Sequence, residues 1–152
     1  MSSGEQRRVV VTLDELVAQL ELIRAEAARL RDLLTQLNAE KSAITAAKES
    51  IDSILKASQG SPVLFPLSTS PVALIEATPV SKDKVIVHLG ADVYAKMDVS
   101  EALKLLAEEE GEYTRAIQEV SQRLAELENL QAQYEAVIRQ AVEAPRRQEA
   151  KG

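Results

Sequence analysis

Apolar residues in the first third of the chain recur at alternating steps of three and four, which is the spacing of a heptad repeat. The repeat continues for about six heptads and is interrupted only by Lys41 and Lys48. It predicts a coiled-coil helix over residues 12–57, capped by Thr12 or Asp14 and ended by the glycine and proline that follow. The repeating positions are Leu13, Leu16, Leu20, Ile23, Ala27, Leu30, Leu34, Leu37, Lys41, Ile44, Lys48, Ile51 and Leu55.

The same spacing returns in the last third of the chain and predicts a second helix over residues 98–143. Asp98 or Ser100 is suited to cap its start, and Pro145 is expected to stop it. The repeating positions are Val99, Leu103, Leu106, Glu110, Tyr113, Ile117, Val120, Leu124, Leu127, Gln131, Tyr134, Ile138 and Ala141.

The two repeats have the same length, which favours pairing of the two helices with each other. If the chain folds back on itself, Leu55 meets Val99 and Leu13 meets Ala141, and every layer between them matches. The expected fold is therefore mainly α, a long antiparallel coiled-coil helix hairpin within one chain. The alternative is that each helix pairs with a helix of another chain.

One part of the predicted seam is charged. Glu110 falls between the layers of Lys41 and Lys48, so the three side chains are expected to neutralise one another while the lysine stems pack along the seam. The neighbouring acidic run EEEGE, residues 108–112, is interpreted as a solvated face rather than a metal site.

Residues 61–97 have a different pattern, seen best in the stretch SKDKVIVHLGADVYAKMD, residues 81–98. Apolar and polar residues alternate there, as in β-strands. The segment predicts two β-hairpins, the first turning at the sequence STSP and the second at Gly90–Ala91. The four β-like runs are residues 63–67, 72–80, 84–89 and 92–97.

These hairpins are interpreted as an oligomerisation module. An isolated hairpin is marginally stable, and four short strands would give a sheet with open edges and one apolar face. The helices are not expected to cover that face, because their own apolar stripes face each other. The predicted oligomerisation residues are Val63, Leu64, Leu67, Val72, Leu74, Val85, Ile86, Val87, Leu89 and Val93.

Composition supports long helices and argues against several functions. The 152 residues include three Tyr, one Phe and no Trp, too few aromatics for an ordinary globular core, and the net charge of −6 disfavours nucleic-acid binding. The chain has no Cys, a single His (His88) and no glycine-rich phosphate loop, so we expect no enzyme activity, metal or cofactor. Without a signal peptide or membrane-spanning run, a cytoplasmic protein is expected.

Apolar residues also gather near both ends of the chain, where a coiled coil covers its last layers poorly. They are candidates to bind apolar segments of other proteins; the alternative is that they close the last layers of the coil. The tails, residues 1–11 and 144–152, are expected to be flexible. The candidates are Val9, Val10, Val11, Leu13, Leu16, Val17, Tyr134, Val137, Ile138 and Val142.

The central segment resembles the α class of prefoldin subunits. The resemblance rests on Pro66-Leu67, on Lys84-Val85-Ile86-Val87, on Gly90 and on the run from Asp98 to Leu106, with two hairpins rather than one. It implies a heterohexamer of two α and four β subunits, in which the hairpins build a platform of β-barrels and the coiled coils hang from it. It further implies that the coiled-coil tips hold unfolded proteins without ATP and pass them to a group II chaperonin.

Three functions therefore stay open at this point. The first is a holdase that binds unfolded clients at its tips. The second is a prefoldin-like scaffold or filament that assembles through its hairpins, and the third is a tether for one defined partner. Apolar residues beside the seam at both ends favour the first.

Overall fold

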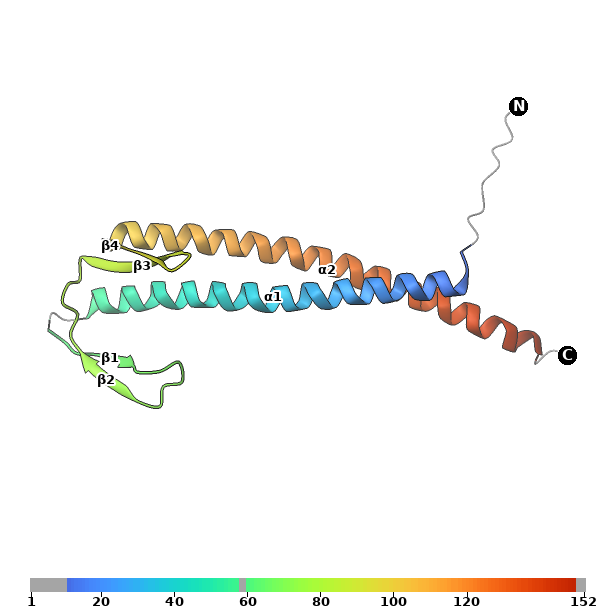
Figure 1. Ribbon diagram of the computed structural model, residues 1–152, viewed down its shortest axis with the longest axis horizontal. Coiled ribbons are helices and arrows are strands. Elements are labelled where there is room, and N and C mark those ends of the chain that lie inside the picture. Colours follow the sequence, from blue (N-terminus) through green and yellow to red (C-terminus); the bar gives the residue numbers. More distant parts are fainter. Residues whose placement is uncertain (1–10, 58–59, 150–152) are drawn as a thin grey trace, which may run out of the picture. The chain divides into compact units, whose positions relative to one another are not determined.

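The computed structural model describes residues 11–57 and 60–149, with side chains up to residue 144. Figure 1 shows the predicted order of helix, two hairpins and helix, which is confirmed. The elements are α1 (Leu13–Lys56), β1 (Val63–Pro66), β2 (Leu74–Ala77), β3 (Lys84–Gly90), β4 (Val93–Asp98) and α2 (Val99–Glu149).

Helix α1 begins with a capping box. The Glu15 backbone N–H donates to Oγ1 of Thr12 at 3.2 Å, and the Thr12 backbone N–H donates to Oε2 of Glu15 at 3.0 Å. These two hydrogen bonds satisfy backbone donors that a helix start leaves without a partner. Of the two predicted caps, Thr12 is therefore the one that is used.

Helix α2 does not stop at Pro145, as the sequence had suggested, but continues to Glu149. A proline has no N–H to donate to the carbonyl four residues earlier, which is costly in a helix interior. Its φ angle is nevertheless helical, and only the last turn follows it here. The expected C-terminal tail from residue 144 is thus largely part of the helix.

The chain forms two compact units. The terminal unit combines residues 1–36 with 117–152, and the hairpin unit comprises residues 37–116. In the terminal unit, α1 and α2 pack antiparallel around a core that buries Ala27 completely. The core residues are Ile23, Ala27, Leu30 and Leu127, with Leu33, Val120, Leu124 and Tyr134 packed against them.

Two ion pairs between the helices of the terminal unit follow the antiparallel direction. Nη2 of Arg24 lies 3.0 Å from Oε1 of Glu135, and Nη2 of Arg31 lies 2.8 Å from Oε1 of Glu128. From the first pair to the second, the chain advances by one heptad on α1 and returns by one heptad on α2. Both pairs therefore belong to the same helix register.

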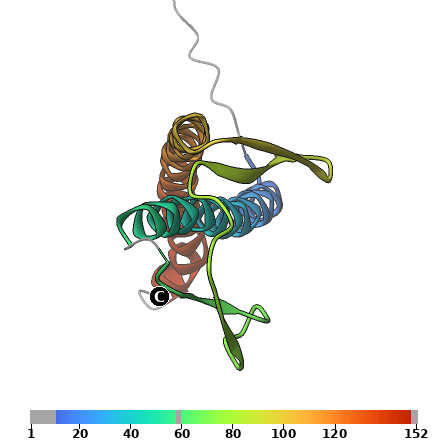
Figure 2. The ribbon, with the colours of Figure 1, turned by 90° about the vertical axis from the view of Figure 1, so that its left-hand side faces the viewer.

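In the hairpin unit, each hairpin is a separate two-stranded antiparallel sheet, not half of one four-stranded sheet. Strand β1 pairs with β2 from Val63↔Ala77 to Pro66↔Leu74. Strand β3 pairs with β4 from Lys84↔Asp98 to Gly90↔Val93, with an irregularity after His88. Figure 2 shows the hairpins as two separate arms beside the helices.

The helices of the hairpin unit cover one face of the β3–β4 hairpin, contrary to the sequence-based expectation. Val87 is buried in one core with Ala102 and Leu106 of α2. The half-buried residues packed against this core are Ile44, Ile51, Val85, Met97 and Leu105. The helices thus have enough apolar surface to pack against each other and also to cover the inward side chains of the β3–β4 hairpin.

The turn of the second hairpin lies at Ala91–Asp92, one residue later than predicted. Both residues have positive φ angles, 46° for Ala91 and 59° for Asp92, as a type I′ hairpin turn requires. Gly90 ends β3 with a φ of 100°. The alanine is thus in a conformation that usually belongs to glycine or asparagine.

Candidate interaction surfaces

Five of the predicted end residues present exposed apolar side chains in the described part of the chain. Their exposed fractions lie between 41% and 48%, so each side chain is partly covered and partly exposed to solvent. Val9 and Val10 lie outside the described residues. The exposed set is Val11, Leu13, Val17, Val137 and Val142, and we call it the end patch.

The other three predicted end residues are half-buried. Tyr134 packs against the core of the terminal unit, which makes it a structural residue as well. Leu16 and Ile138 lie on the heptad positions and are also half-buried. For these three residues, the alternative that they close the helix seam agrees with their burial.

The sequence interpretation missed two exposed apolar residues of the terminal unit, Leu22 and Leu130. Leu22 is 65% exposed and Leu130 is 37% exposed. Both lie off the heptad positions, which is the same signal that singled out Val17. Neither residue lies at the end of a repeat, where the helices were expected to cover their last layers poorly.

Charge on the flank of the terminal unit is organised around Glu135. Its carboxylate accepts a hydrogen bond from Nε2 of Gln131 and pairs with Arg24, and these two contacts lower the pKa of Glu135 below the ordinary value. The hydrogen bond to Glu135 in turn raises the pKa of Arg24. An ion pair thus links the two helices on this flank, whereas the five residues of the end patch are uncharged.

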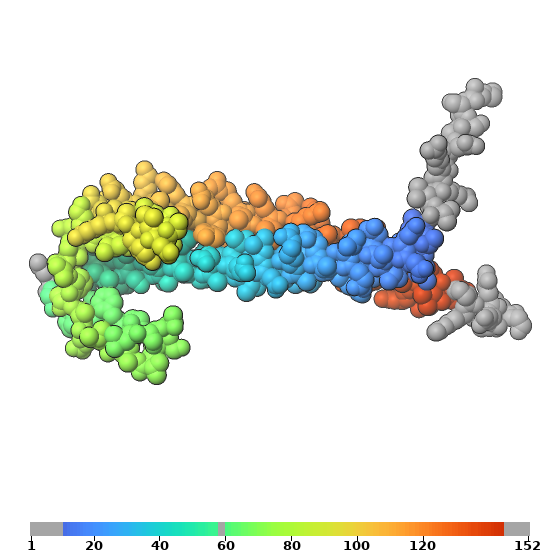
Figure 3. Space-filling view, viewed as in Figure 1, coloured from blue at the N-terminus to red at the C-terminus, as the bar shows by residue number. Residues whose placement is uncertain are grey.

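The β1–β2 hairpin carries apolar side chains on both faces. Phe65 and Ile75 are directly opposite each other on one face, and Leu64 and Leu74 lie on the other. All four side chains are exposed, and Figure 3 shows the hairpin standing clear of the helices. Within the part of the chain that the structure describes, these four side chains therefore keep 39% to 58% of their surface exposed.

The β3–β4 hairpin has one covered and one open face. Val85 and Val87 face the helices, and Val87 is only 8% exposed, so these two predicted oligomerisation residues belong to the core of this chain. Ile86, which alternates with them, is 69% exposed. On the open face the rings of His88 and Tyr94 lie 4.9 Å apart between centroids.

Eight of the ten predicted oligomerisation residues are thus left outside that core. Seven of them are exposed: Leu64, Leu67, Val72, Leu74, Ile86, Leu89 and Val93. Val63 is half-buried. The sequence interpretation missed four further exposed residues of this segment, Phe65, Ile75, Val80 and Tyr94, although their place in β-like runs would have identified them.

The charged position in the seam makes one of the two predicted contacts, the one between Lys48 and Glu110. Nζ of Lys48 lies 3.6 Å from Oε1 of Glu110, and Oγ1 of Thr45 donates to Oε2 of Glu110 at 2.9 Å. A threonine hydroxyl, rather than Lys41, is therefore the second partner of this carboxylate.

Two other features, a metal site and a membrane-spanning helix, are not found among the described residues. Across residues 11–57 and 60–149, no group of three or more His, Cys, Asp or Glu side chains is placed to hold a metal ion. Among the same residues, neither helix has a stretch long and apolar enough to cross a membrane.

Comparison with known proteins connects this geometry to one family. The family model of the prefoldin subunit matches residues 23–144, which is more than half of the chain. The chain is 35% identical over 121 residues to prefoldin subunit alpha of Aeropyrum pernix, covering 80% of this chain and 79% of that protein. It is 30% identical over 134 residues to prefoldin subunit alpha of Metallosphaera sedula, covering 88% of this chain and 92% of that protein.

A solved structure has the same fold. The cryo-EM structure of filamentous PFD from Methanocaldococcus jannaschii matches with a TM-score of 0.64 and 25% sequence identity. The match covers 84% of this chain and 98% of that chain. The helix hairpin with two small β-hairpins is therefore an arrangement already known from a prefoldin.

Proposed function

The chain belongs to the prefoldin family, and we propose that it is the α-class subunit of a holdase that captures unfolded proteins without ATP. The family is one of chaperones rather than enzymes. In this proposal, unfolded segments bind the end patch of the terminal unit through contacts between apolar side chains. The observation that carries it is the exposure of Val17, Val137 and Val142 beside the helix seam, where a helix that only pairs with its neighbour has no need of apolar side chains.

Prefoldin subunits assemble with one another, and the similarity to α-class relatives supports such an oligomer for this chain. We propose a complex of two α and four β subunits joined through the hairpins. The apolar residues on both faces of β1–β2 support this arrangement, because a hairpin exposed on both sides is stabilised only when other chains cover it.

The proposal includes transfer of the client to a group II chaperonin. Residues 1–11 contain one acidic and two basic residues, and residues 142–152 contain two acidic and three basic residues. Both ends of an otherwise acidic chain are therefore slightly basic. Such ends suit docking on an acidic surface, which raises the rate of encounter more than the affinity.

The test measures suppression of client aggregation. A model protein is diluted from denaturant, without ATP, into the full chain assembled with a β-type prefoldin subunit. Since α2 runs to Glu149, deleting residues 142–152 would remove part of a helix, and point substitutions give the sharper test. The test variant is the triple substitution Val17→Ser, Val137→Ser and Val142→Ser.

The matched control is Leu22→Ser, which removes the most exposed large apolar side chain of α1 away from the end patch. We expect the triple variant to lose most of the protection and the control to keep it, with both still assembled. Equal protection by the triple variant and the parent would remove the end patch from the mechanism. Equal loss of protection in the control would mean that any exposed apolar residue of the chain can bind the client.

A structural scaffold or filament is the second candidate. The observation that favours it is the similarity to a filamentous prefoldin structure. The two candidates differ in what the chain does without a partner subunit. Sedimentation of the chain alone into long polymers, together with no protection by the mixed complex, would support the scaffold and contradict the holdase.

A further inference from the structure

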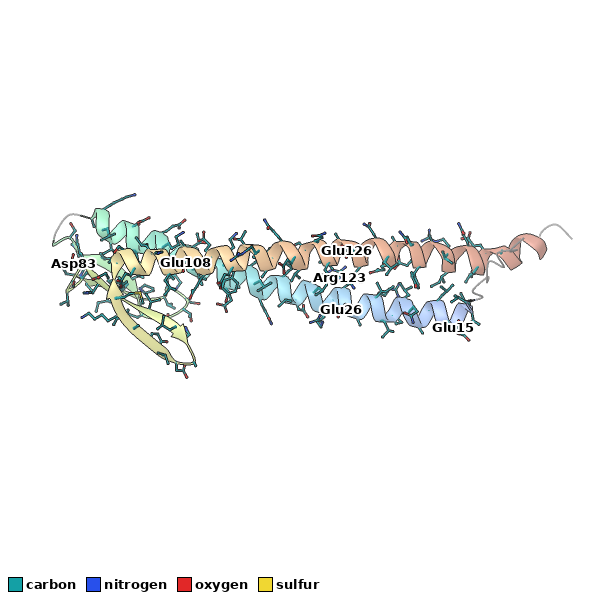
Figure 4. The ribbon with its side chains drawn as sticks, turned by 90° about the horizontal axis from the view of Figure 1, so that it is seen from above. Glu15, Glu26, Asp83, Glu108, Arg123 and Glu126 are labelled. Atoms are coloured by element: carbon teal, nitrogen blue, oxygen red, sulfur yellow. The ribbon has the colours of Figure 1, made fainter. Side chains whose placement is uncertain are left out.

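Residues 78–83 connect the two hairpins, since β2 ends at Ala77 and β3 begins at Lys84. We call these residues the connector. They belong to the hairpin unit, as do the end of α1 and the start of α2. Figure 4 shows Asp83 of the connector at the end of the helices from which the hairpins leave. The connector thus passes close to the ends of both helices.

The side chain of Lys82 binds the end of α1. Its Nζ donates a hydrogen bond to the backbone carbonyl of Ala57 at 2.7 Å, and this contact is partly buried. Ala57 follows the last residue of α1, and its own N–H still donates to the carbonyl of Ser53, as in the helix. The last carbonyls of a helix have no donor within the helix and carry partial negative charge, so an ammonium group stabilises them.

The next residue of the connector binds the start of α2. The backbone N–H of Val99, the first residue of α2, donates to the carbonyl of Asp83 at 3.0 Å. The Asp83 N–H in turn donates to Oγ of Ser81 at 3.2 Å, which closes a short turn just before β3. Two consecutive residues, Lys82 and Asp83, therefore attach the connector to both helices.

The two hairpins differ in what holds them to the helices. The β3–β4 hairpin packs on them through Val87 and runs directly from β4 into α2. Neither hydrophobic core of the described residues contains a residue of β1 or β2. The position of the β1–β2 hairpin thus depends on the chain at either end of it, and at the exit from β2 this chain is fixed to α1 by Lys82.

We propose that Lys82 is a positioning residue for assembly, which holds the β1–β2 hairpin in the orientation that partner subunits bind. A hairpin that leaves the helices in a fixed direction loses less conformational entropy when a partner covers its apolar side chains. This inference rests on the proposed assembly through the hairpins. It adds a residue that acts from the connector rather than from the apolar surface.

The alternative role for Lys82 is that of a cap, which stabilises the end of α1 and nothing else. A cap changes the free energy of unfolding. A positioning residue changes the rate of association, because only chains with a correctly oriented hairpin bind a partner. The rate of dissociation should not depend on Lys82, since the partner itself holds the hairpin in the complex.

The first test measures the position of the hairpin in the full chain. The chain has no cysteine, so Ser50→Cys on α1 and Ser70→Cys in the turn of the first hairpin provide two sites for spin labels. Both serines are exposed and lie in the hairpin unit. Pulsed electron spin resonance, with the labelled chain diluted in unlabelled chain, gives the distribution of distances between the labels. Lys82→Met should broaden this distribution, and an unchanged distribution would overturn the proposal.

The second test measures the kinetics of binding to a β-type prefoldin subunit. Lys82→Met should slow association about fivefold, which corresponds to one lost hydrogen bond, and leave the rate of dissociation unchanged. Lys82→Arg keeps a charged donor and should restore most of the association rate. The matched control is Lys56→Met, because Lys56 lies in the last turn of α1 but outside the connector. This control should associate like the parent.

The outcomes separate this proposal from the assembly on which it rests. The double variant Leu64→Ser and Leu74→Ser changes two exposed side chains of the hairpin itself. Unchanged binding of the β-type subunit by this double variant would contradict assembly through β1–β2. Weaker binding by it, together with normal association of Lys82→Met, would overturn the positioning role and leave the assembly in place.

Two further results would also overturn the positioning role. Equal slowing of association in Lys56→Met would assign the effect to charge at the end of α1. A lower free energy of unfolding in Lys82→Met, with an unchanged association rate, would make Lys82 a helix cap alone.

Discussion

Nζ of Lys48 lies 3.6 Å from Oε1 of Glu110, which joins the two helices of the hairpin unit by an ion pair at positions that a coiled coil usually fills with apolar residues. Both side chains are partly buried, and Thr45 donates a hydrogen bond to the same carboxylate. A polar contact at such a position favours one helix register over others, because every shifted register leaves the charges unpaired.

Removing one partner of this ion pair should cost more than removing both. We expect Lys48→Met to lower the free energy of unfolding by about 1 kcal/mol, since Glu110 then keeps only its hydrogen bond to Thr45. Adding Glu110→Met should restore most of the loss, because two apolar side chains pack in the seam. Denaturant unfolding of the full chain measures both values; a double variant as unstable as the single one would contradict this account.

Truncation of two adjacent residues of β3 should change two different properties, the stability of the chain and its assembly. Val87→Ala removes buried methyl groups from the core of the hairpin unit, so we expect a loss of about 2 kcal/mol in unfolding free energy. Ile86→Ala, on the open face, should change that free energy by less than about 0.5 kcal/mol. It should instead weaken assembly with partner subunits, measured by sedimentation. Equal destabilisation by the two substitutions would show that the hairpin does not pack on the helices by this face.

The second hairpin can be stabilised at its turn. Ala91 has a φ of 46°, a region that glycine adopts without steric cost, so Ala91→Gly should raise the unfolding free energy by about 0.5–1 kcal/mol. Ala95→Gly, in the interior of β4, is the control and should lower it by a similar amount, since glycine loses more freedom in a strand. A loss of stability in Ala91→Gly would mean that the turn is not strained.

The ion pair between Arg24 and Glu135 should make the terminal unit sensitive to acid. The pKa of Glu135 in the folded chain lies below its ordinary value of 4.5, so its stabilising effect is fully present above pH 4.5 and is lost as the pH falls through the lowered pKa. We expect Glu135→Gln to lower the melting temperature at neutral pH and to match the parent at a pH well below 4.5.

The control for the acid experiment is Glu119→Gln, which removes an exposed carboxylate of the same helix that has no ion pair among the described residues. It should leave the melting temperature close to that of the parent at both pH values. A difference between Glu135→Gln and the parent that persists in acid would assign the effect to packing rather than to charge.

Much of this architecture could be predicted from the amino-acid sequence. The three-and-four spacing from Leu13 to Leu55 and from Val99 to Ala141 predicted the two helices, because a helix repeats its faces at nearly that period. Alternation of apolar and polar residues in the segment before Asp98 predicted two hairpins, because successive side chains of a strand point to opposite faces. Apolar residues beside the seam, such as Val17 and Val137, identified the end patch without knowledge of any contact.

Only the tertiary structure decided which surfaces stay open. Val85, Ile86 and Val87 are similar apolar residues, and nothing in their order reveals that 85 and 87 face the helices while 86 does not. That choice depends on how β3 meets residues far along the chain, such as Ile44 and Leu106. Periodicity reports the local backbone, whereas burial is settled by packing between distant segments.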